Sequence, residues 1–149
     1  MNATKFRVLA LLAVVAAVIG FSAMRVWESS GHGPFPLPWS ALVGMLVIAA
    51  AVLVVGWPVR RWNNGERDRR IDPLRAARTA VLAKASSHSG ALLVGWYAGQ
   101  ALVVVPDLGI EPRRDRLVLS VLAVLAATAM VVSGLVAERW CRLPEDDDA

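Results

Sequence analysis

Arginine and lysine residues gather between positions 60 and 84, and they are the one group of side chains that indicates a binding chemistry. Guanidinium groups bind phosphate oxygens through a planar fork of N–H donors. A helix with Asp72 as N-cap and Pro73 as its first residue would place Arg75 and Arg78 one turn apart. We therefore predict a site for a lipid headgroup or an acidic partner, formed by Arg67, Arg69, Arg70, Arg75, Arg78 and Lys84. The alternative is that these cations only fix the orientation of the chain in a membrane.

No set of residues has the spacing of a known catalytic or metal-binding motif. The sequence contains no His-x-x-x-His, no Gly-x-Ser-x-Gly and no phosphate-binding glycine loop. Cys141 is the only cysteine, so no internal disulfide can form. An enzyme acting on lipids would have to use Asp72, Glu138, His32 or His88. We expect that the protein is not an enzyme and uses no cofactor or metal.

The elements that carry these residues follow from the apolar composition. Apolar residues make up 56% of the 149 residues and form long blocks of Ala, Val and Leu without a polar face. The mean hydropathy is +0.52. A helix of about twenty apolar residues crosses the ~30 Å hydrocarbon core of a bilayer. The sequence predicts a single all-α domain, an integral membrane bundle of four transmembrane helices, with spans at 8–24, 39–57, 89–106 and 117–137.

The first span begins after Lys5 and Arg7, as the apolar region of a secretory signal peptide also does. Signal peptides have shorter apolar regions, of about 7 to 15 residues, and end in a site with small side chains. Here bulky Phe21 occupies the position that would have to be small for cleavage after Ala23. We expect a retained helix rather than a cleaved leader.

The second span has Trp39 and Trp57 at its ends, and such amphipathic rings suit the headgroup region of a bilayer. Pro58 is expected to close this span. Residues 58–88 are predicted to be a basic cytoplasmic loop that contains a juxtamembrane helix from Pro73 onward. This helix is expected to run into the third span as one continuous or kinked helix.

The distribution of Lys and Arg predicts the orientation. The N-terminal segment has two of these residues, the 58–88 loop eight and the C-terminal tail two. The loops at 25–38 and 107–116 have one and three, and the second of these is predicted to be compact. Because cytoplasmic segments carry the excess of basic residues, both termini and the 58–88 loop are predicted to lie inside (N-in and C-in). The acidic tail, residues 143–149, is then cytoplasmic.

Small residues recur every four positions along the third span, which places them on one helix face. Such a face lets another helix approach closely, and this is a common basis of helix association in lipid. The neighbour is either another helix of the same chain or a second copy. The predicted helix-packing face comprises Ser87, Ala91, Gly95, Gly99 and Gln100. Gln100 is a polar group within hydrocarbon, so we expect it to find a hydrogen-bond partner across a helix contact.

The four predicted spans contain no Asp, Glu, Lys, Arg or His. Proton-coupled transport needs a titratable group within the membrane, as in the small multidrug exporters with an embedded glutamate. That mechanism is therefore not expected. A transporter or channel for a small neutral or anionic solute, with Gln100 and serines as ligands, remains the alternative function.

Three strings of the sequence, DPLRAARTAVLAKASS at 72–87, GWYAGQ at 95–100 and ERWCRLP at 138–144, are distinctive together. With them, nearly the whole chain resembles a family of small actinobacterial membrane proteins of unknown function. The resemblance implies four spans and a place in the bacterial inner (cell) membrane. It implies no activity, cofactor or catalytic residue.

The function that we favour from the sequence is a non-enzymatic one. We expect a multi-pass scaffold or accessory subunit that binds a partner protein or anionic lipid through the segment from Asp72 to Gln100. Its expected partners are the lipid bilayer, anionic lipid, and a membrane protein partner or a second copy in a homo-oligomer. Nucleic acid is not expected, because the basic residues lie between apolar blocks and lack interleaved aromatic residues.

Overall fold

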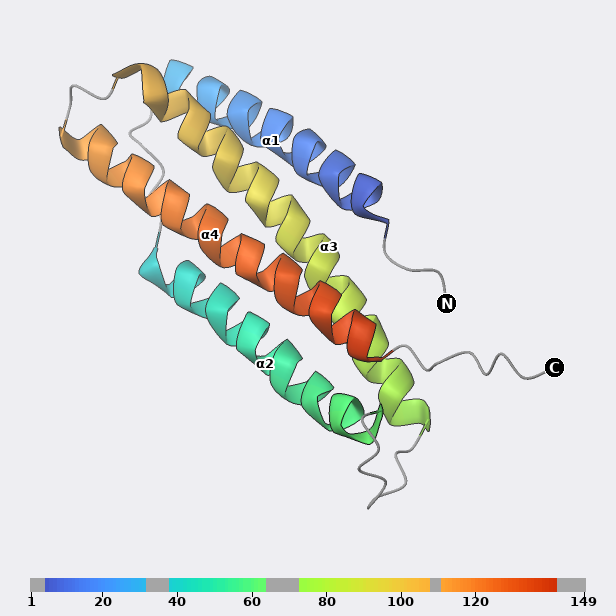
Figure 1. Ribbon diagram of the computed structural model, residues 1–149. Coiled ribbons are helices and arrows are strands. Elements are labelled where there is room, and N and C mark those ends of the chain that lie inside the picture. The colour runs from blue at the N-terminus through green and yellow to red at the C-terminus, as the bar shows by residue number, and fades with distance from the viewer. Residues whose placement is uncertain (1–4, 32–37, 64–72, 108–110, 142–149) are drawn as a thin grey trace.

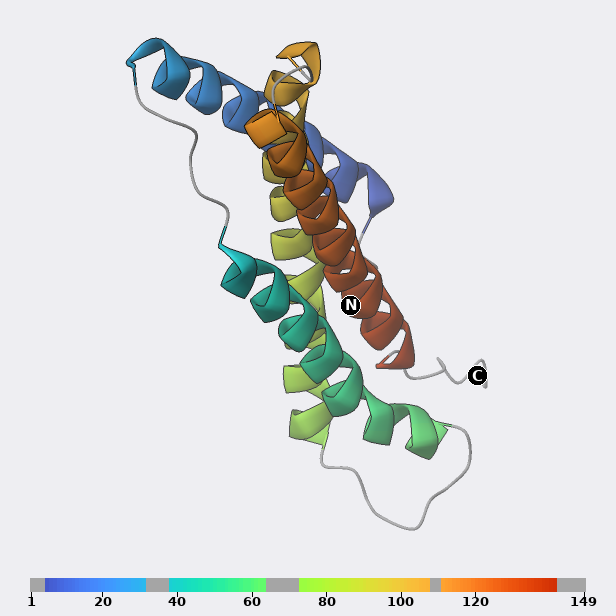
Figure 2. The same cartoon turned by 90° about the vertical axis from the view of Figure 1, so that its left-hand side faces the viewer.

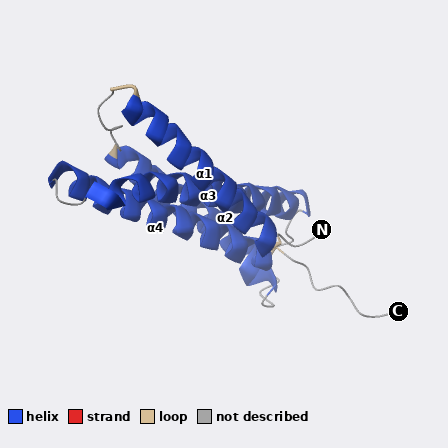
Figure 3. Ribbon diagram, turned by 90° about the horizontal axis from the view of Figure 1, so that it is seen from above, coloured by secondary structure: helices blue, strands red, loops and turns tan. Residues whose placement is uncertain are grey.

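The chain folds into four long helices. The computed structural model describes residues 5–31, 38–63, 73–107 and 111–141. Its elements are α1 (Phe6–Ser29), α2 (Trp39–Asn63), α3 (Pro73–Val104), the short 3-10 helix η1 (Val105–Asp107) and α4 (Glu111–Trp140). Each long helix runs antiparallel to the one before it (Figure 1). In the part of the chain that is described, helices are the only regular structure (Figure 3), which confirms the all-α prediction.

The helices are neighbours in the order α1, α3, α4, α2 rather than in chain order. α3 packs along both α1 and α4, whereas α2 packs mainly on α4 and touches α3 much less. α1 lies beside the C-terminal part of α3, and α2 lies beside the C-terminal part of α4 (Figure 2). α3 and α4 therefore form the centre of the fold, and α1 and α2 its two edges.

Helix α1 continues beyond the predicted span at 8–24, so residues 25–29 are helical rather than part of a loop. It ends where the Val26 carbonyl accepts a backbone hydrogen bond from Ser30 at 3.1 Å and hydroxyl bonds from Ser29 and Ser30. Gly31 follows with a φ of +76°, the left-handed conformation that commonly ends helices and that glycine adopts without strain. The helix end is thus set by local turn chemistry.

Helix α2 contains Pro58 in its interior and continues to Asn63, so it does not close at this proline as predicted. A proline removes one helical hydrogen bond and crowds the carbonyl four residues before it. Contacts beyond the proline offset this cost, because Val59 is buried and the Arg60 guanidinium lies over the rings of two tryptophans. Tertiary packing therefore maintains the last turns of α2.

Helix α3 begins at Pro73, the residue predicted to start the juxtamembrane helix, and continues to Val104. The juxtamembrane helix and the predicted third span are therefore one helix of 32 residues, about 48 Å long at 1.5 Å per residue. Asp72, the predicted N-cap, lies outside the described residues. So does the acidic tail, residues 143–149.

Helix α4 begins at Glu111, within the segment 107–116 that was predicted to be a compact loop. The three arginines of that segment, Arg113, Arg114 and Arg116, consequently stand on the first turns of a helix. A helix gives such side chains fixed directions at 3.6 residues per turn. One of the three points into the protein, as described below.

Small residues form the contact between α3 and α4. A Cβ atom added at Gly90 would lie 2.9 Å from the backbone nitrogen of Val131, and one added at Gly134 would lie 2.8 Å from the nitrogen of Ser87. The two backbones thus approach as closely as glycine allows, which is the packing favoured within lipid. Ala127, whose carbonyl lies at Gly90, and Ala83, whose carbonyl lies at Gly134, are both completely buried in this contact.

Three of the described helices are long and apolar enough to cross a membrane: α1, residues Trp39–Arg61 of α2, and residues Arg113–Trp140 of α4. α3 is not among them, because its sequence contains serines, glycines and a glutamine between the apolar residues. The outer surfaces of α1 and α2 are rich in exposed Val, Leu and Ile side chains. Such an exterior suits hydrocarbon rather than water.

Candidate functional site

The predicted basic site is only partly described. Arg67, Arg69 and Arg70 lie outside the described residues, and Arg75 stands in the first turn of α3. Arg78 and Lys84 are both exposed on α3. The structure therefore brings at least these two cations onto the same exposed part of one helix.

The first half of α3 has two distinct faces. The buried face packs on α4, where the Ser86 hydroxyl donates a hydrogen bond to the Met130 carbonyl at 3.3 Å. The opposite face combines cations with apolar side chains, of which Val81 is 63% and Leu82 45% exposed. We call this surface the exposed α3 face, and it consists of Ala77, Arg78, Val81, Leu82, Lys84 and Ala85.

The exposed α3 face is open because α1 is too short to cover it. α1 runs parallel to α3, with Ala13 lying against Gly95. Phe6 is seven residues before Ala13 and therefore lies near the level of His88, which is seven residues before Gly95. Because Phe6 is the first residue of α1, no turn of α1 lies beside residues 77–85 of α3. Phe6 itself is 78% exposed, and Lys5 and Arg7 beside it are exposed too. Lys5 and Arg7 thus stand near the level of residues 87–89, just beyond the C-terminal end of the exposed α3 face.

The predicted helix-packing face contacts two different helices of the same chain. Gly95 and Gly99 lie against α1, where an added Cβ would meet the carbonyl oxygens of Ala13 and Ala17. Ser87 lies against α4, next to Gly134. Four residues exceed one helical turn of 3.6 residues, so a stripe at this spacing winds about 40° around the helix at each step. A homo-oligomer formed through Gly95 and Gly99 would have to displace α1.

Gln100 is 4% exposed, and its Oε1 atom has no hydrogen-bond partner within the described structure. For this atom, the hydrogen-bond partner predicted across a helix contact is not found among the described residues. The remaining member of the predicted face, Ala91, is 3% exposed and contributes to the packed interior. Gln100 is therefore enclosed by protein.

Arg116 is a buried residue that the sequence analysis assigned to a loop. It is 7% exposed, its Nη2 donates a hydrogen bond to the sulfur of Met24 at 3.3 Å, and its Nη1 lies 4.0 Å from the Glu28 carboxylate. The guanidinium thereby joins α4 to α1. The spacing from Arg116 to Ser120, Ala123 and Ala127 follows one helix face, and this pattern would have predicted that Arg116 points inward.

An aromatic cluster joins α2 to α4 at the opposite end of the fold. The Arg60 guanidinium lies 5.3 Å from the ring centre of Trp57 and 5.0 Å from that of Trp140. The two rings are 6.2 Å apart and nearly perpendicular, a favourable arrangement for aromatic pairs. Trp57, predicted to be an interface anchor, therefore also fixes the end of α2.

The remaining reactive side chains do not form a common site. His88 lies 2.8 Å from the Lys84 carbonyl on its own helix, and His32 lies outside the described residues. Burial, and to a lesser degree the Glu138 carboxylate, raises the pKa of the Cys141 thiol. Among the residues that are described, no three of His, Cys, Asp and Glu come together as metal ligands would.

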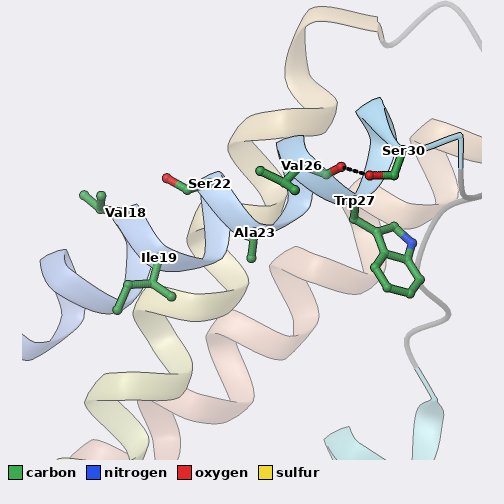
Figure 4. Close-up of a pocket in the computed structure, with 7 residues that line it drawn as sticks. All are labelled: Val18, Ile19, Ser22, Ala23, Val26, Trp27 and Ser30. Carbon is green, nitrogen blue, oxygen red and sulfur yellow. Dashed lines mark hydrogen bonds between the residues drawn. The ribbon is translucent and has the colours of Figure 1, made fainter.

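Two hollows on the described surface lie on α1, and both are shallow. One is lined by a single face of α1, with Val18, Ile19, Ser22, Ala23, Val26, Trp27 and Ser30 (Figure 4). A second lies beside it, at Arg25, Val26, Glu28 and Ser29. Because all these side chains come from one helix, each hollow is open outer surface. Neither hollow reaches Gln100.

Long apolar helices, an aliphatic exterior and a close-packed interior of small residues define the class of protein, which is an all-helical membrane protein. Within this class, the chain belongs to a family of proteins of unknown function, DUF3180, which matches residues 9–145. The expected membership in a family of unknown function is thereby confirmed. No curated protein and no solved structure matches the chain.

Proposed function

We propose that the protein is a multi-pass component of the bacterial inner membrane that crosses the bilayer with four helices and acts by binding rather than by catalysis. The proposal takes α3 as the fourth span. It is supported by the position of α3 between α1 and α4, both of which are apolar and long enough to cross a membrane. A helix covered on two sides needs fewer apolar residues than one that faces lipid.

The proposed orientation has both termini in the cytoplasm. The N-terminal ends of α1 and α3 and the C-terminal ends of α2 and α4 lie toward the same end of the fold (Figure 1). Among the described residues, the cations of this end include Lys5, Arg7, Arg60, Arg61, Arg78, Lys84 and Arg139. This excess supports a cytoplasmic location, because basic residues flank the inner ends of membrane helices.

The observation that carries the binding role is the exposed α3 face. Arg78 and Lys84 suit the phosphate of an anionic headgroup, and Val81 and Leu82 beside them suit the adjoining acyl chains. Each cation close to an anionic membrane surface contributes about 1 kcal/mol to the attraction. We therefore propose that the accessory or scaffold role rests on anionic lipid bound at this face, with a partner protein as the other candidate occupant.

Native mass spectrometry of the full chain in detergent tests this proposal, with phosphatidylglycerol and phosphatidylcholine added in turn. The wild type should retain phosphatidylglycerol preferentially, and Arg78→Gln with Lys84→Gln should lower this retention several-fold. Arg114→Gln is the matched control. Arg114 is an exposed cation in the first turns of α4, at the end of the fold opposite to Arg78 and Lys84. Equal retention of both lipids, or an equal effect of the control, would contradict lipid binding at this face.

A partner protein at the same face would give a different result. A protein that copurifies stoichiometrically from native membranes, and is lost with Val81→Ser and Leu82→Ser while lipid retention is unchanged, would replace lipid as the occupant. The alternative function, a small-solute transporter or channel past Gln100, has less support, because Gln100 is enclosed by protein and neither described hollow leads to it.

A further inference from the structure

Three buried polar atoms have no hydrogen-bond partner in the described part of the chain. They are Oε1 of Gln100, Nε of Arg116 and Oγ of Ser120. Their residues are 4%, 7% and 0% exposed, respectively. Buried polar groups in folded proteins almost always bond to protein or to ordered water. A cluster of three such groups would therefore mark a place where a small polar ligand belongs.

Arg116 and Ser120 share one face of α4. They are four residues apart, so their side chains lie one turn apart on the same side of the helix. The same face continues through Ala123 and Ala127, both of which are completely buried. Ala127 lies against Gly90 of α3, so this is the face that packs on α3. Both groups therefore point toward the α3 side of the fold.

Gln100 lies at the same level of the fold as these two residues. Gly90 of α3 lies against Ala127 and Val131 of α4. Because α3 and α4 are antiparallel, moving ten residues forward on α3 corresponds to moving ten residues back on α4. This register puts Gln100 at the level of residues 117–121 of α4, which is the level of Ser120 and about one turn from that of Arg116.

Helix α1 closes this region from a third side. The Met24 sulfur accepts the hydrogen bond from Nη2 of Arg116, and Glu28 lies on the next turn. Gly99, directly before Gln100, lies against the backbone of Ala17 and Phe21. The three polar groups therefore lie where α1, α3 and α4 meet, shielded from the surface.

We propose that Gln100, Arg116 and Ser120 form an internal water site at the junction of α1, α3 and α4. The Arg116 Nε–H donates to the water oxygen, the water donates to Oε1 of Gln100, and the Ser120 hydroxyl takes either role. A buried water needs two to four polar partners, and this set provides three. The mixture of a donor, an acceptor and an amphoteric hydroxyl matches water.

An anion matches the same groups less well. Oε1 of Gln100 is an acceptor and would repel an anion, while the Glu28 carboxylate already lies beside the guanidinium. Water bound between the helices would satisfy the Gln100 carbonyl without a direct bond between side chains. It would also connect α3 to α4 at the end of the fold where α1 is held by Arg116.

Water-edited solid-state NMR of the full chain in lipid bilayers tests the proposal. The Gln100 side-chain amide and Ser120 should receive polarisation from water several-fold faster than Ser87. Ser87 is the internal reference, because it is equally buried and its hydroxyl donates to the Lys84 carbonyl at 2.9 Å. Transfer to Gln100 and Ser120 that is no faster than transfer to Ser87 would overturn the proposal without requiring any variant.

Two further measurements identify the ligand. Gln100→Leu should reduce the transfer to Ser120 to the level of Ser87, while the control Ser133→Ala should leave transfer to Gln100 and Ser120 unchanged. Ser133 is a suitable control because it is buried and its hydroxyl donates to the Met130 carbonyl on its own helix. An anomalous bromide peak between these side chains, in crystals grown with bromide, would show an anion site and overturn the assignment to water.

Discussion

A methyl group introduced at Gly95 should loosen α1 from α3. A Cβ at this position would lie 2.8 Å from the Cβ of Ala16 and would also meet the Ala13 carbonyl. Two carbon atoms in favourable contact are about 3.5–4.0 Å apart, so the helices would have to separate by about 1 Å here. Gly99 lies equally close to the backbone of α1. A shift of α1 along α3 would therefore not relieve the contact at Gly95.

The size of the effect follows from two opposing terms. Overpacking of this kind costs about 1–3 kcal/mol. Alanine in place of glycine within a helix stabilises it by about 1 kcal/mol. Gly95→Ala should therefore lower the free energy of unfolding by about 1 kcal/mol. Gly44 of α2 provides the matched control, because an added Cβ there meets nothing within 4 Å. Gly44→Ala should therefore show only the stabilisation that comes from the higher helix propensity of alanine.

Unfolding of the detergent-solubilised protein, followed by tryptophan fluorescence, measures both variants under the same conditions. Gly95→Ala should unfold at a lower temperature than the wild type, and Gly44→Ala at a temperature equal to or above it. Gly56→Ala should fall between them, since its Cβ would lie 3.3 Å from Ala137 and from the Trp140 ring. A stabilising effect of Gly95→Ala similar to that of Gly44→Ala would refute close packing of α1 on α3.

Two further predictions concern the cytoplasmic end proposed above. Arg60→Gln should destabilise the protein by about 0.5–2 kcal/mol through the loss of two cation–π contacts. Arg25→Gln removes one contact, at 5.4 Å from the Phe21 ring, and should cost less; equal shifts in denaturant unfolding would argue against the aromatic cluster. Alkylation of Cys141 should follow a pH curve displaced above that of a free thiol, whose pKa is about 8.5, because only the thiolate reacts and burial raises its pKa. Glu138→Gln should move the curve part of the way back, and a wild-type curve identical to that of a free thiol would contradict the burial.

The apolar helices could be predicted because hydrophobicity over about twenty residues is a local property of the sequence. Three predicted spans, 8–24, 39–57 and 117–137, fall within helices long and apolar enough to cross a membrane. The start of α3 at Pro73 was also predictable, because proline is favoured at the first helical position. The ends of the helices were harder to predict. α2 continues through Pro58 because the turn after the proline packs on other residues.

The surroundings of individual side chains depend on which helices are neighbours. Local sequence patterns do not predict which helices pack together. The four-residue stripe of small residues predicted one packing face, yet Gly95 and Gly99 contact α1 while Ser87 contacts α4. Arg116 was predicted to lie in the loop before the fourth span, although its helical spacing from Ser120 favoured the interior. The first difference arises from the position of α3 between two helices, and the second from the start of α4 at Glu111, which turns Arg116 toward Met24 and Glu28 of α1.

The same position explains why α3, unlike the other three long helices described, has no stretch apolar enough to count as a membrane span by composition. α4 packs along α3 and α1 covers its C-terminal part, so Ser86, Ser87, Gln100 and the three glycines of α3 are buried against protein. α1, at the edge of the fold, has one protein neighbour along its length and is almost continuously apolar. We infer that hydropathy in this fold measures how much of a helix faces lipid, not whether the helix lies at membrane depth. On this reasoning the polar residues of α3 follow from its central place and are compatible with a fourth span. The exposed α3 face then lies beyond the end of α1, at the level of the headgroups.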